Sequence, residues 1–381
     1  MSTRHFSALQ AAILATEESS SPFVAFMGEI GLARELLFLA STHALHYASS
    51  VFEGIRAFRQ HDGQLKVWLL DAHLDRFEHS LRLARMVPPV SREVMTRQIL
   101  DLVALHDDGQ SPSVYIRPFC LRGEGLGVDA SDIETYFAVL TRPWGAYVAN
   151  SYNGGAKVYV SPRSRPTADM VNGTAKLAGF YGLWSVPEKL VAKAAGCDEA
   201  IFAPNLDQCL QDGTGQEIMV WTKSGERLVL ARHRGSDGAN ILHSTTRAFL
   251  TEGLTSEHAK RFPYREVPAI SLHCDPIEGM ALVGTASGVV PVTRLHVPQT
   301  DGTVVEIDVG DGHPHPQAVD LATFYRRVVS GMYPEYDHLL TLVPDPKEVI
   351  TRAYFNNELT ESAHTRWGLM SLTRQQERLP L

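Results

Sequence analysis

The sequence has few cysteines, no long apolar run and no basic tract, and each absence excludes a class of protein. Its four cysteines include no Cys-x-x-Cys pair, which argues against a zinc ribbon and against a redox dithiol. No segment approaches the roughly 18 apolar residues that a membrane-spanning helix needs. The formal net charge is -8, and no run of Lys and Arg is long enough to form a nucleic-acid surface.

The N-terminus and the scattered thiols give an expectation for the compartment. The short apolar stretch 8–15 is interrupted by Gln10 and is followed by acidic and serine residues without a small-residue cleavage site. It is interpreted as an amphipathic arm and not as a signal peptide. Widely spaced thiols are typical of a reducing compartment. We therefore expect a cytoplasmic protein with neither a membrane nor a nucleic acid as its partner.

The pattern of apolar residues and turns predicts an α/β fold with two domains in 381 residues. A small N-terminal α/β domain is expected over 1–141. The segment 142–155 is rich in Gly, Asn and Pro and is the predicted interdomain linker. A large domain is expected over 156–343, and the polar segment 344–381 is a predicted C-terminal extension.

Local periodicity predicts the elements of both domains. Strands are predicted at 23–27, 52–58, 64–70, 114–121, 136–140, 157–160, 199–203, 218–222, 227–231 and 280–283. Helices are predicted at 71–86, 91–106, 177–195, 246–254 and 317–329. Asp71 and Ser91 are predicted to cap the first two helices.

Lys176 is the candidate around which the other reactive residues are arranged. It lies between the turn-rich stretch 163–174 and a predicted helix, and its neighbours are mostly apolar, which predicts an interior site. An ammonium there is costly unless it is neutralised or used covalently. Formation of a Schiff base with an aldehyde cofactor does both, so Lys176 is the predicted catalytic amine. The alternative is an ordinary surface lysine.

One arginine and two segments are candidates for binding a phosphate group. Arg76, on the predicted helix 71–86, offers a planar fork of donors, although a solvated helix residue is an equal alternative. The segment 244–247 precedes an apolar periodic run, and the free amides of a helix start attract anions, although it could be an ordinary cap. The segment 284–288 follows a strand and could form a second nest of amides.

Asp212, Tyr115 and Arg117 supply the remaining candidates. Asp212 lies in a tight turn before the predicted strand 218–222. Its carboxylate would keep a pyridine nitrogen protonated, or it would be a hairpin residue without a role in the site. Tyr115 and Arg117 share one face of a predicted strand, so Arg117 would bind a substrate carboxylate or form a structural ion pair.

Two further patterns are discounted. The glycine-rich segment 123–127 lacks the strand–turn–helix context of a dinucleotide fingerprint. The histidine pairs His43 with His46 and His313 with His315 have no acidic or thiol partner at metal-ligand spacing, so no metal site is expected.

Taken together, these segments resemble the class IV aminotransferases, and most closely the branched-chain amino-acid aminotransferases. The segments that carry the resemblance are 43–47, 51–56, 72–76, 115–118, 143–147, 176–181, 196–200, 212–219, 245–247 and 284–286. The resemblance implies fold type IV, with a small N-terminal α/β domain and a larger C-terminal domain that has a barrel-like sheet and binds the cofactor. It also implies a homodimer.

The resemblance implies roles for the individual residues. Lys176 would hold pyridoxal 5'-phosphate as an aldimine, Tyr181 would bond the ring hydroxyl and Asp212 would face the ring nitrogen. The residues implied to bind the phosphate are Arg76, Thr245, Thr246 and Thr285. The residues implied to line the substrate pocket or its rim are Tyr47, Phe52, Gly54, Tyr115, Arg117, Leu126, Val128, Trp144, Thr285 and Ala286. Tyr47 and Val128 would belong to the rim, which the other subunit would complete.

The implied reaction is transfer of an amino group from an apolar, branched-chain-like amino acid to a 2-oxo acid such as 2-oxoglutarate, as in amino-acid biosynthesis. Several departures from the family's pattern lie near the cofactor. Asp212 stands where glutamate is usual, and Phe180 stands where asparagine is usual. The segments 215–217 and 242–247 also differ from the usual Gly-Glu-Asn and Leu-Pro-Gly-Ile-Thr-Arg. They leave open a lyase or a specialised-metabolite transaminase with a non-standard amino substrate. A non-catalytic binding module on the same fold is the third alternative.

Overall fold

The computed structural model describes residues 23–33, 36–145, 154–204, 210–231, 240–271 and 277–349. The chain divides into two compact units, one formed by Met1–Gly145 with Leu339–Leu381 and the other by Ala146–His338. The predicted arm 8–15, most of the predicted linker 142–155 and the predicted extension beyond residue 349 lie outside the described residues. The predicted domain boundaries therefore stay a prediction. No helix in the described ranges is long and apolar enough to cross a membrane.

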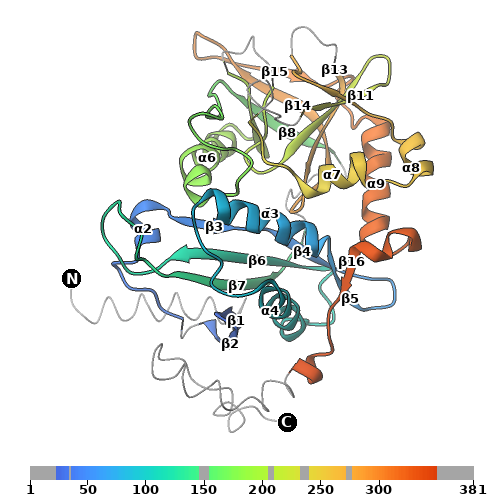
Figure 1. Ribbon diagram of the computed structural model, residues 1–381. Helices are drawn as coiled ribbons and strands as arrows, with labels where there is room; N and C mark the ends of the chain where they lie inside the picture. The colour runs from blue at the N-terminus through green and yellow to red at the C-terminus, as the bar shows by residue number, and fades with distance from the viewer. Residues whose placement is uncertain are drawn as a thin grey trace. The chain divides into compact units, whose positions relative to one another are not determined.

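The first unit is built on an eight-stranded sheet in the order β16-β5-β4-β6-β7-β1-β2, with β3 beside β6 (Figure 1). Its strands are β1 (Phe23–Phe26), β2 (Glu29–Leu32), β3 (Ser50–Phe52), β4 (Ile55–Arg59), β5 (Leu65–Trp68), β6 (Ser113–Arg122), β7 (Thr135–Pro143) and β16 (Leu340–Leu342). Each pair of neighbouring strands in this sheet is antiparallel. The predicted strand 52–58 is divided between β3 and β4.

Helices α3 (Leu70–Leu83) and α4 (Arg92–Leu105) cover one face of this sheet. The ring centroid of Phe77 on α3 lies 6.0 Å from that of Phe137. His106, just after α4, lies with Nδ1 2.5 Å from the hydroxyl of Thr141. Phe137 and Thr141 are four residues apart on β7, so their side chains project from the same face.

The ends of these helices test the predicted caps. The residue before α3 is Leu69, at φ 51, and its side chain makes no cap hydrogen bond, so the prediction that Asp71 caps the helix is wrong. Asp71 lies in the first turn instead, where a negative charge favours the helix dipole. The prediction for Ser91 is confirmed, since its hydroxyl accepts a hydrogen bond from the N–H of Val94 at 3.4 Å.

The second unit contains a mixed eight-stranded sheet in the order β12-β11-β10-β13-β14-β8-β9, with β15 beside β14. Its strands are β8 (Ala156–Ser161), β9 (Glu199–Phe202), β10 (Glu217–Thr222), β11 (Arg227–Leu230), β12 (Arg265–Val267), β13 (Ile277–Gly284), β14 (Gly288–Pro298) and β15 (Val304–Asp308). An isolated bridge between Ile201 and Gly213 ties β9 to the turn before β10. Alternate aliphatic residues such as Val158 and Val160 lie in the core of this unit. The predicted α/β fold is confirmed, and each unit contains one sheet.

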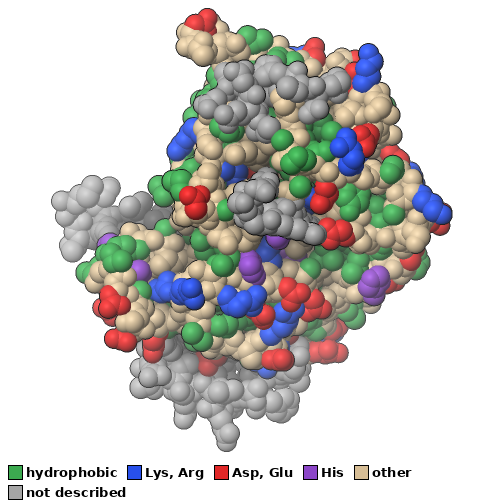
Figure 2. All heavy atoms as spheres, turned by 45° about the horizontal axis from the view of Figure 1, so that its top comes forward, with side chains coloured by type: hydrophobic (Ala, Val, Ile, Leu, Met, Phe, Trp, Pro, Cys, Tyr) green, Lys and Arg blue, Asp and Glu red, His purple; other side chains and the backbone are tan. Residues whose placement is uncertain are grey.

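The helices of the second unit connect these strands. They are α5 (Ala178–Phe180), the π-helix η2 (Tyr181–Ser185), α6 (Val186–Ala194), α7 (Thr245–Glu252), α8 (Ser256–Arg261) and α9 (Pro316–Val329). The predicted helix 177–195 is thus interrupted by a π-helical turn. On the face shown in Figure 2, the described acidic and basic side chains are interspersed.

Candidate active site

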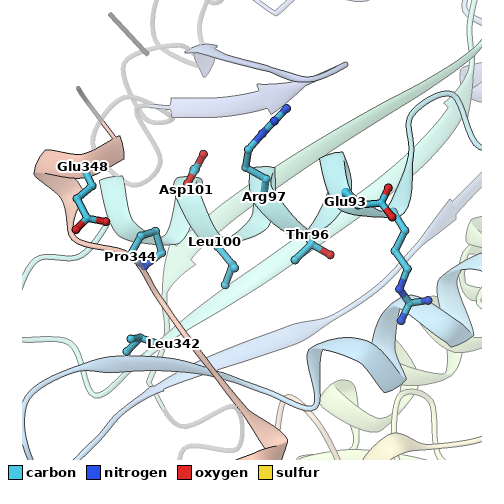
Figure 3. Close-up of a pocket in the computed structure, with 9 residues that line it drawn as sticks. Glu93, Thr96, Arg97, Leu100, Asp101, Leu342, Pro344 and Glu348 are labelled. Atoms are coloured by element: carbon cyan, nitrogen blue, oxygen red, sulfur yellow. The ribbon is translucent and has the colours of Figure 1, made fainter. Parts of the chain in front are cut away.

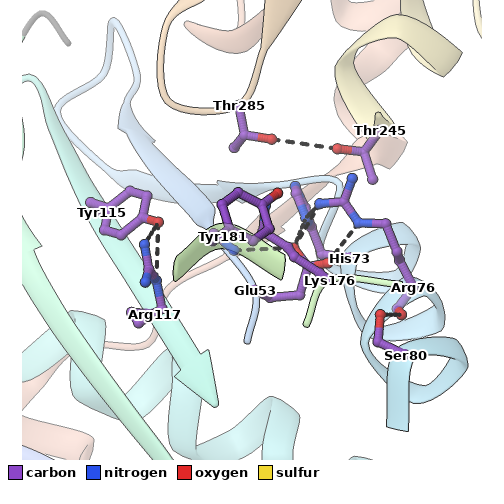
Figure 4. Close-up of polar contacts among 11 residues, drawn as sticks. Glu53, His73, Arg76, Ser80, Tyr115, Arg117, Lys176, Tyr181, Thr245 and Thr285 are labelled. Atoms are coloured by element: carbon purple, nitrogen blue, oxygen red, sulfur yellow. Dashed lines mark hydrogen bonds and ion pairs between the residues drawn. The ribbon is translucent and has the colours of Figure 1, made fainter. Parts of the chain in front are cut away.

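Lys176 precedes the short helical segment that begins with α5. Its side chain is half-buried, not fully interior as expected, and Nζ donates a hydrogen bond to the phenol oxygen of Tyr181 at 2.9 Å (Figure 4). The same Nζ lies 4.7 Å from the centroid of the Tyr181 ring. The π-helix η2 begins at Tyr181, and such turns are frequent at functional sites. The structure therefore brings the predicted amine and the predicted phenol together.

Strand β9 fixes the turn that carries Asp212. The N–H of Phe202 donates to the carbonyl oxygen of Asp212 at 3.1 Å. The hydroxyl of Thr214, two residues further on, donates to the carboxylate of Glu199, which is fully buried. Glu199 also accepts a hydrogen bond from Lys189 Nζ at 2.7 Å, so its charge is paired. The backbone around Asp212 is held by a strand and by a paired carboxylate.

The carboxyl group of Asp212 is buried and unusually basic. Burial raises its pKa to about 7, although Arg165, whose Nη1 lies 3.5 Å from Oδ2, opposes that rise. Among the described residues, Oδ1 has no hydrogen-bond partner. Glu217 differs, because its oxygens accept from the N–H of Ser244 at 2.8 Å and from Arg247 Nη1 at 3.1 Å. Oδ1 of Asp212, unlike the two oxygens of Glu217, is thus an acceptor that no described donor uses.

The start of α7 gathers hydroxyl groups. Ser244 is the N-cap, as the sequence indicates, and its hydroxyl accepts from the N–H of Arg247 at 3.2 Å. Thr245 follows it, and its hydroxyl lies 3.5 Å from that of Thr285, in the turn between β13 and β14 (Figure 4). Thr246 is fully buried, and its hydroxyl has no hydrogen-bond partner among the described residues. The free N–H groups at the start of a helix attract anions, and a buried hydroxyl without a partner could donate to one, so this position is suited to binding an anion.

In the first unit, Arg76 on α3 is bound to a buried carboxylate. Its Nε lies 2.6 Å from Oε1 of Glu53, and its Nη2 lies 2.7 Å from Oε2 (Figure 4). Nδ1 of His73 lies 3.0 Å from the same Oε2. Although burial alone would raise the pKa of Glu53, Arg76 and His73 hold it well below its usual range. The ion pair fixes the plane of the Arg76 guanidinium.

Tyr115 and Arg117 lie on the face of the first sheet that α3 and α4 leave uncovered. Tyr115 pairs with residue 142 of β7, and Arg117 pairs with residue 140. Paired residues share a face of the sheet, and residues 140 and 142 lie on the face opposite to that of Phe137, which contacts α3. Nη2 of Arg117 donates to the phenol oxygen of Tyr115 at 2.5 Å (Figure 4). In the described part of the chain no carboxylate forms an ion pair with Arg117. The guanidinium is thus oriented without being neutralised, as the binding of an anionic ligand requires.

Aromatic rings surround this pair. The Cζ of Arg117 lies 4.5 Å from the centroid of the Phe52 ring, and the Trp144 ring stacks on Tyr115 with centroids 4.7 Å apart. Gly54 makes room for them, because a Cβ at that position would lie 2.6 Å from the hydroxyl of Tyr115. The structure therefore gathers these predicted substrate-binding residues.

The predicted rim residues belong to a short helix and to the segment 126–128, and hydrogen bonds join the two. Helix α2 (His43–Tyr47) ends in Tyr47, whose phenol oxygen accepts from the N–H of Gly127 at 3.1 Å. His43 bonds the carbonyl oxygen of Gly127 through Nε2 at 2.9 Å. Leu126 and Val128 are 71% and 89% exposed, which is unusual for apolar side chains. These residues form an apolar surface on the first unit.

The predicted site residues thus form two groups, one in each unit. The group in the first unit is Tyr47, Phe52, Gly54, Arg76, Tyr115, Arg117, Leu126, Val128 and Trp144. The group in the second unit is Lys176, Tyr181, Asp212, Thr245, Thr246, Thr285 and Ala286. Sequence reasoning missed the supporting charges Glu53, Arg165 and Glu199. Glu53 and Glu199 are charged residues beside or inside an apolar strand, and that pattern is the signal that a buried partner exists. Arg165 lies in a polar, turn-rich segment that gives no such signal.

A hollow of about 680 Å³ lies elsewhere on the first unit, between α4 and the segment after β16 (Figure 3). Its lining includes Thr96, Leu100 and Leu342. None of the predicted site residues lines it, so it plays no part in the site. Within the described residues there is also no group of three or more His, Cys, Asp and Glu side chains that could hold a metal ion.

Comparisons with known proteins relate this geometry to a family. A family model described as amino-transferase class IV matches residues 50–295. Branched-chain-amino-acid transaminase 1 of Bacillus subtilis (strain 168) is 28% identical over 280 residues, covering 71% of this chain and 76% of that protein. The branched-chain-amino-acid aminotransferase of Pseudomonas aeruginosa is 27% identical over 318 residues, covering 83% and 95% respectively.

Solved structures agree in fold. The branched-chain amino acid aminotransferase of T.th. with pyridoxamine 5'-phosphate has a TM-score of 0.72 at 28% identity and covers 85% of this chain and 99% of that one. The same protein complexed with N-(5'-phosphopyridoxyl)-L-glutamate has a TM-score of 0.71 at 27% identity, with the same coverage.

Proposed function

Because the chain belongs to the class IV aminotransferase family, we propose that it moves an amino group between a branched-chain amino acid and a 2-oxo acid such as 2-oxoglutarate. The predicted enzyme class, aminotransferase, and the predicted cofactor, pyridoxal 5'-phosphate, are confirmed. The observation that carries the proposal is the contact of Lys176 Nζ with Tyr181, in the unit that also holds the buried Oδ1 of Asp212, which has no described hydrogen-bond partner.

The polar groups of the second unit are suited to binding pyridoxal phosphate. Asp212 Oδ1 is a buried acceptor without a partner in the described chain, which suits a protonated ring nitrogen. Thr246 Oγ1 is likewise a buried hydroxyl without a described partner at the start of α7, which suits a phosphate oxygen. Tyr181 already holds the Lys176 amine and would also bond the ring hydroxyl. When bound, the cofactor supplies an aldehyde that joins to amines and a ring that withdraws electrons from the substrate Cα.

Lys176 has two tasks in this proposal. Its amine would hold the cofactor, and in its free form the same amine would accept the proton from the substrate Cα. The phenol of Tyr181 orients this amine, because the 2.9 Å contact fixes the direction of Nζ. Thr245, Thr246 and Thr285 would bind the phosphate through their hydroxyls, and Arg76 would add its charge.

The first unit would supply the recognition of the substrate. Phe52, Tyr115 and Trp144 offer an apolar and aromatic surface for a branched side chain. Arg117 carries a positive charge without a carboxylate partner in the described residues, and it would bind the distal carboxylate of glutamate or 2-oxoglutarate. One pocket would thus accept an apolar side chain and an anionic one in turn.

We also propose a homodimer in the cytoplasm. The exposed side chains of Tyr47, Leu126 and Val128 form an apolar surface that a second copy of the chain would cover. Cys120 and Cys197 are free thiols, as is usual in a reducing compartment. Sedimentation of the purified protein tests the dimer directly.

A panel of amino donors tests the proposed reaction. With 2-oxoglutarate as acceptor, leucine, isoleucine and valine should yield glutamate, whereas aspartate should yield little. The variant Lys176→Ala, as control, should yield none. The lyase and the specialised-metabolite transaminase are not favoured, because the relatives are branched-chain aminotransferases. Absence of turnover with every aliphatic donor would revive them.

A further inference from the structure

Arg165 is a buried arginine that the proposed reaction does not yet use. It lies in the turn-rich segment before Lys176, and its side chain is 4% exposed. Its backbone N–H donates to Oε1 of Gln211 at 2.8 Å, which links this segment to the turn that carries Asp212. Its Nε donates to the carbonyl oxygen of Asn240 at 3.3 Å. A guanidinium is costly to bury, so its placement calls for an electrostatic reason.

The face of Phe180 supports the guanidinium. The Cζ of Arg165 lies 4.6 Å from the centroid of the Phe180 ring, a cation–π geometry that gains strength when the pair is desolvated. Phe180 is itself fixed, because the ring of Trp184 stacks on it at 5.7 Å with an interplanar angle of 7°. The stack of Trp184, Phe180 and Arg165 therefore holds a positive charge in one plane.

The carboxylate that this charge faces is Asp212, with Nη1 3.5 Å from Oδ2. The other charged groups that act on Asp212 are Glu217 and Arg247, and they pair with each other at 3.1 Å. Arg247 also pairs with Glu266 at 2.7 Å. Glu217 raises the pKa of Asp212 and Arg247 lowers it, while Arg165 exerts the largest effect of any charged side chain and favours the ionised form of Asp212.

Arg165 also contacts two of the several positions at which this chain departs from the pattern of the family it resembles. Phe180 stands in place of the usual asparagine, and Asp212 in place of the usual glutamate. One contacts the guanidinium through its ring and the other through its carboxylate. Both side chains contact the same buried cation, so the three side chains form one connected group.

We propose that Arg165, held on the face of Phe180, is a positioning residue that keeps Asp212 ionised opposite a protonated ring nitrogen of the cofactor. The proposal rests on the proposed function and deepens it. Asp212 and the ring nitrogen share one proton, which can reside on either. The positive charge beside Oδ2 stabilises the carboxylate, so the proton resides on the nitrogen and Oδ1 accepts the hydrogen bond. Without that charge the proton moves to Asp212 and the ring becomes neutral.

The protonation of the ring nitrogen can be read directly from holoenzyme reconstituted with ¹⁵N-labelled pyridoxal phosphate. In the unchanged protein at pH 8, the ¹⁵N resonance should have the protonated value. In Arg165→Met it should shift toward the unprotonated value, and the dissociation constant of the cofactor should rise by about tenfold, as expected for one pKa unit. Arg165→Lys, which keeps the charge, should stay nearer the unchanged protein. Phe180→Leu should shift in the same direction as Arg165→Met, but less.

Arg163→Met is the matched control. Arg163 lies two residues away, is about half exposed and pairs with Glu188 at 3.0 Å, so its loss should leave the ¹⁵N resonance unchanged. If the resonance in Arg165→Met and in Phe180→Leu stays at the protonated value, the proposal is overturned. Borohydride labelling separates this failure from a failure of the proposed function, because the latter predicts no label on Lys176 even in the unchanged protein.

Discussion

Arg76 donates to both carboxylate oxygens of Glu53, from Nε at 2.6 Å and from Nη2 at 2.7 Å. The two residues come from α3 and from the turn between β3 and β4, and the carboxylate of Glu53 is completely buried. A bidentate pair of this kind fixes the plane of a guanidinium as well as its position. The phosphate-binding arginine of the proposed site is therefore oriented by a residue that would itself touch no ligand.

Glu53→Gln should destabilise the protein and weaken cofactor binding. Removal of one partner leaves the charge of Arg76 buried, which costs about 3–5 kcal/mol. The pKa of Glu53 is depressed in the folded protein, so its stabilisation is present above its unfolded pKa and is lost as pH falls. In urea unfolding, the difference from the unchanged protein should be largest at neutral pH and should shrink in acid. The exposed control Glu134→Gln should change neither property.

Asp212→Asn should stabilise the apoenzyme in a pH-dependent way. Burial raises the pKa of Asp212 to about 7, so its contribution to stability is complete below the unfolded pKa and is lost as pH rises toward 7. The variant should match the unchanged apoenzyme near pH 4 and exceed it at pH 8 by up to about 4 kcal/mol. It should also bind the cofactor more weakly at pH 8. A stability difference that is the same at both pH values would contradict this account of Asp212.

Thr246→Val should separate apoenzyme stability from cofactor affinity. The hydroxyl of Thr246 is buried without a partner in the described residues, so its replacement by a methyl group should leave the apoenzyme equally stable or more stable. Loss of a hydrogen bond to a charged phosphate should reduce cofactor affinity by about tenfold or more. Thr251→Val is the control, because the hydroxyl of Thr251 bonds the carbonyl oxygen of Arg247 within α7. An unchanged affinity in Thr246→Val would remove this residue from the phosphate site.

Arg117→Met should change the preference between substrates. The side chain carries a charge that donates to Tyr115 and has no carboxylate partner in the described chain. Its loss should raise the KM for 2-oxoglutarate by about 10- to 100-fold, the value of a charge-assisted hydrogen bond, and should affect the KM for leucine much less. Arg122→Met serves as the control, since Arg122 on the same strand bonds backbone carbonyl groups of the two residues that follow α3. An equal rise for both substrates would exclude the distal carboxylate as the partner of Arg117.

Periodicity in the sequence predicts most elements of both sheets, because buried strands and amphipathic helices leave an apolar pattern. It fails where tertiary contacts decide the local geometry. The helix predicted over 177–195 has the correct composition, yet the stack of Phe180 and Trp184 accompanies a π-helical turn at 181–185. Strand β15 (Val304–Asp308) escapes prediction for the opposite reason: it is exposed along its whole length, so no alternation records a buried face.

In the candidate site, too, the sequence predicts some residues and not others. The residues proposed to bind the cofactor belong to motifs, and the sequence alone indicates Lys176, Tyr181 and Asp212. Glu53 and Arg165 are not indicated, because their roles arise from partners 23 and 47 residues away in the chain, Arg76 and Asp212. Burial of a charge becomes evident only when the fold places its counter-charge.

The attachment of the cofactor to Lys176 is the most direct test of the whole account. Holoenzyme is reduced with borohydride, which converts a Schiff base into a stable secondary amine, and the modified peptide is identified by mass spectrometry. The account predicts a single phosphopyridoxyl label on Lys176, and none in Lys176→Ala. A label on another lysine, or no label in the unchanged protein, would contradict it.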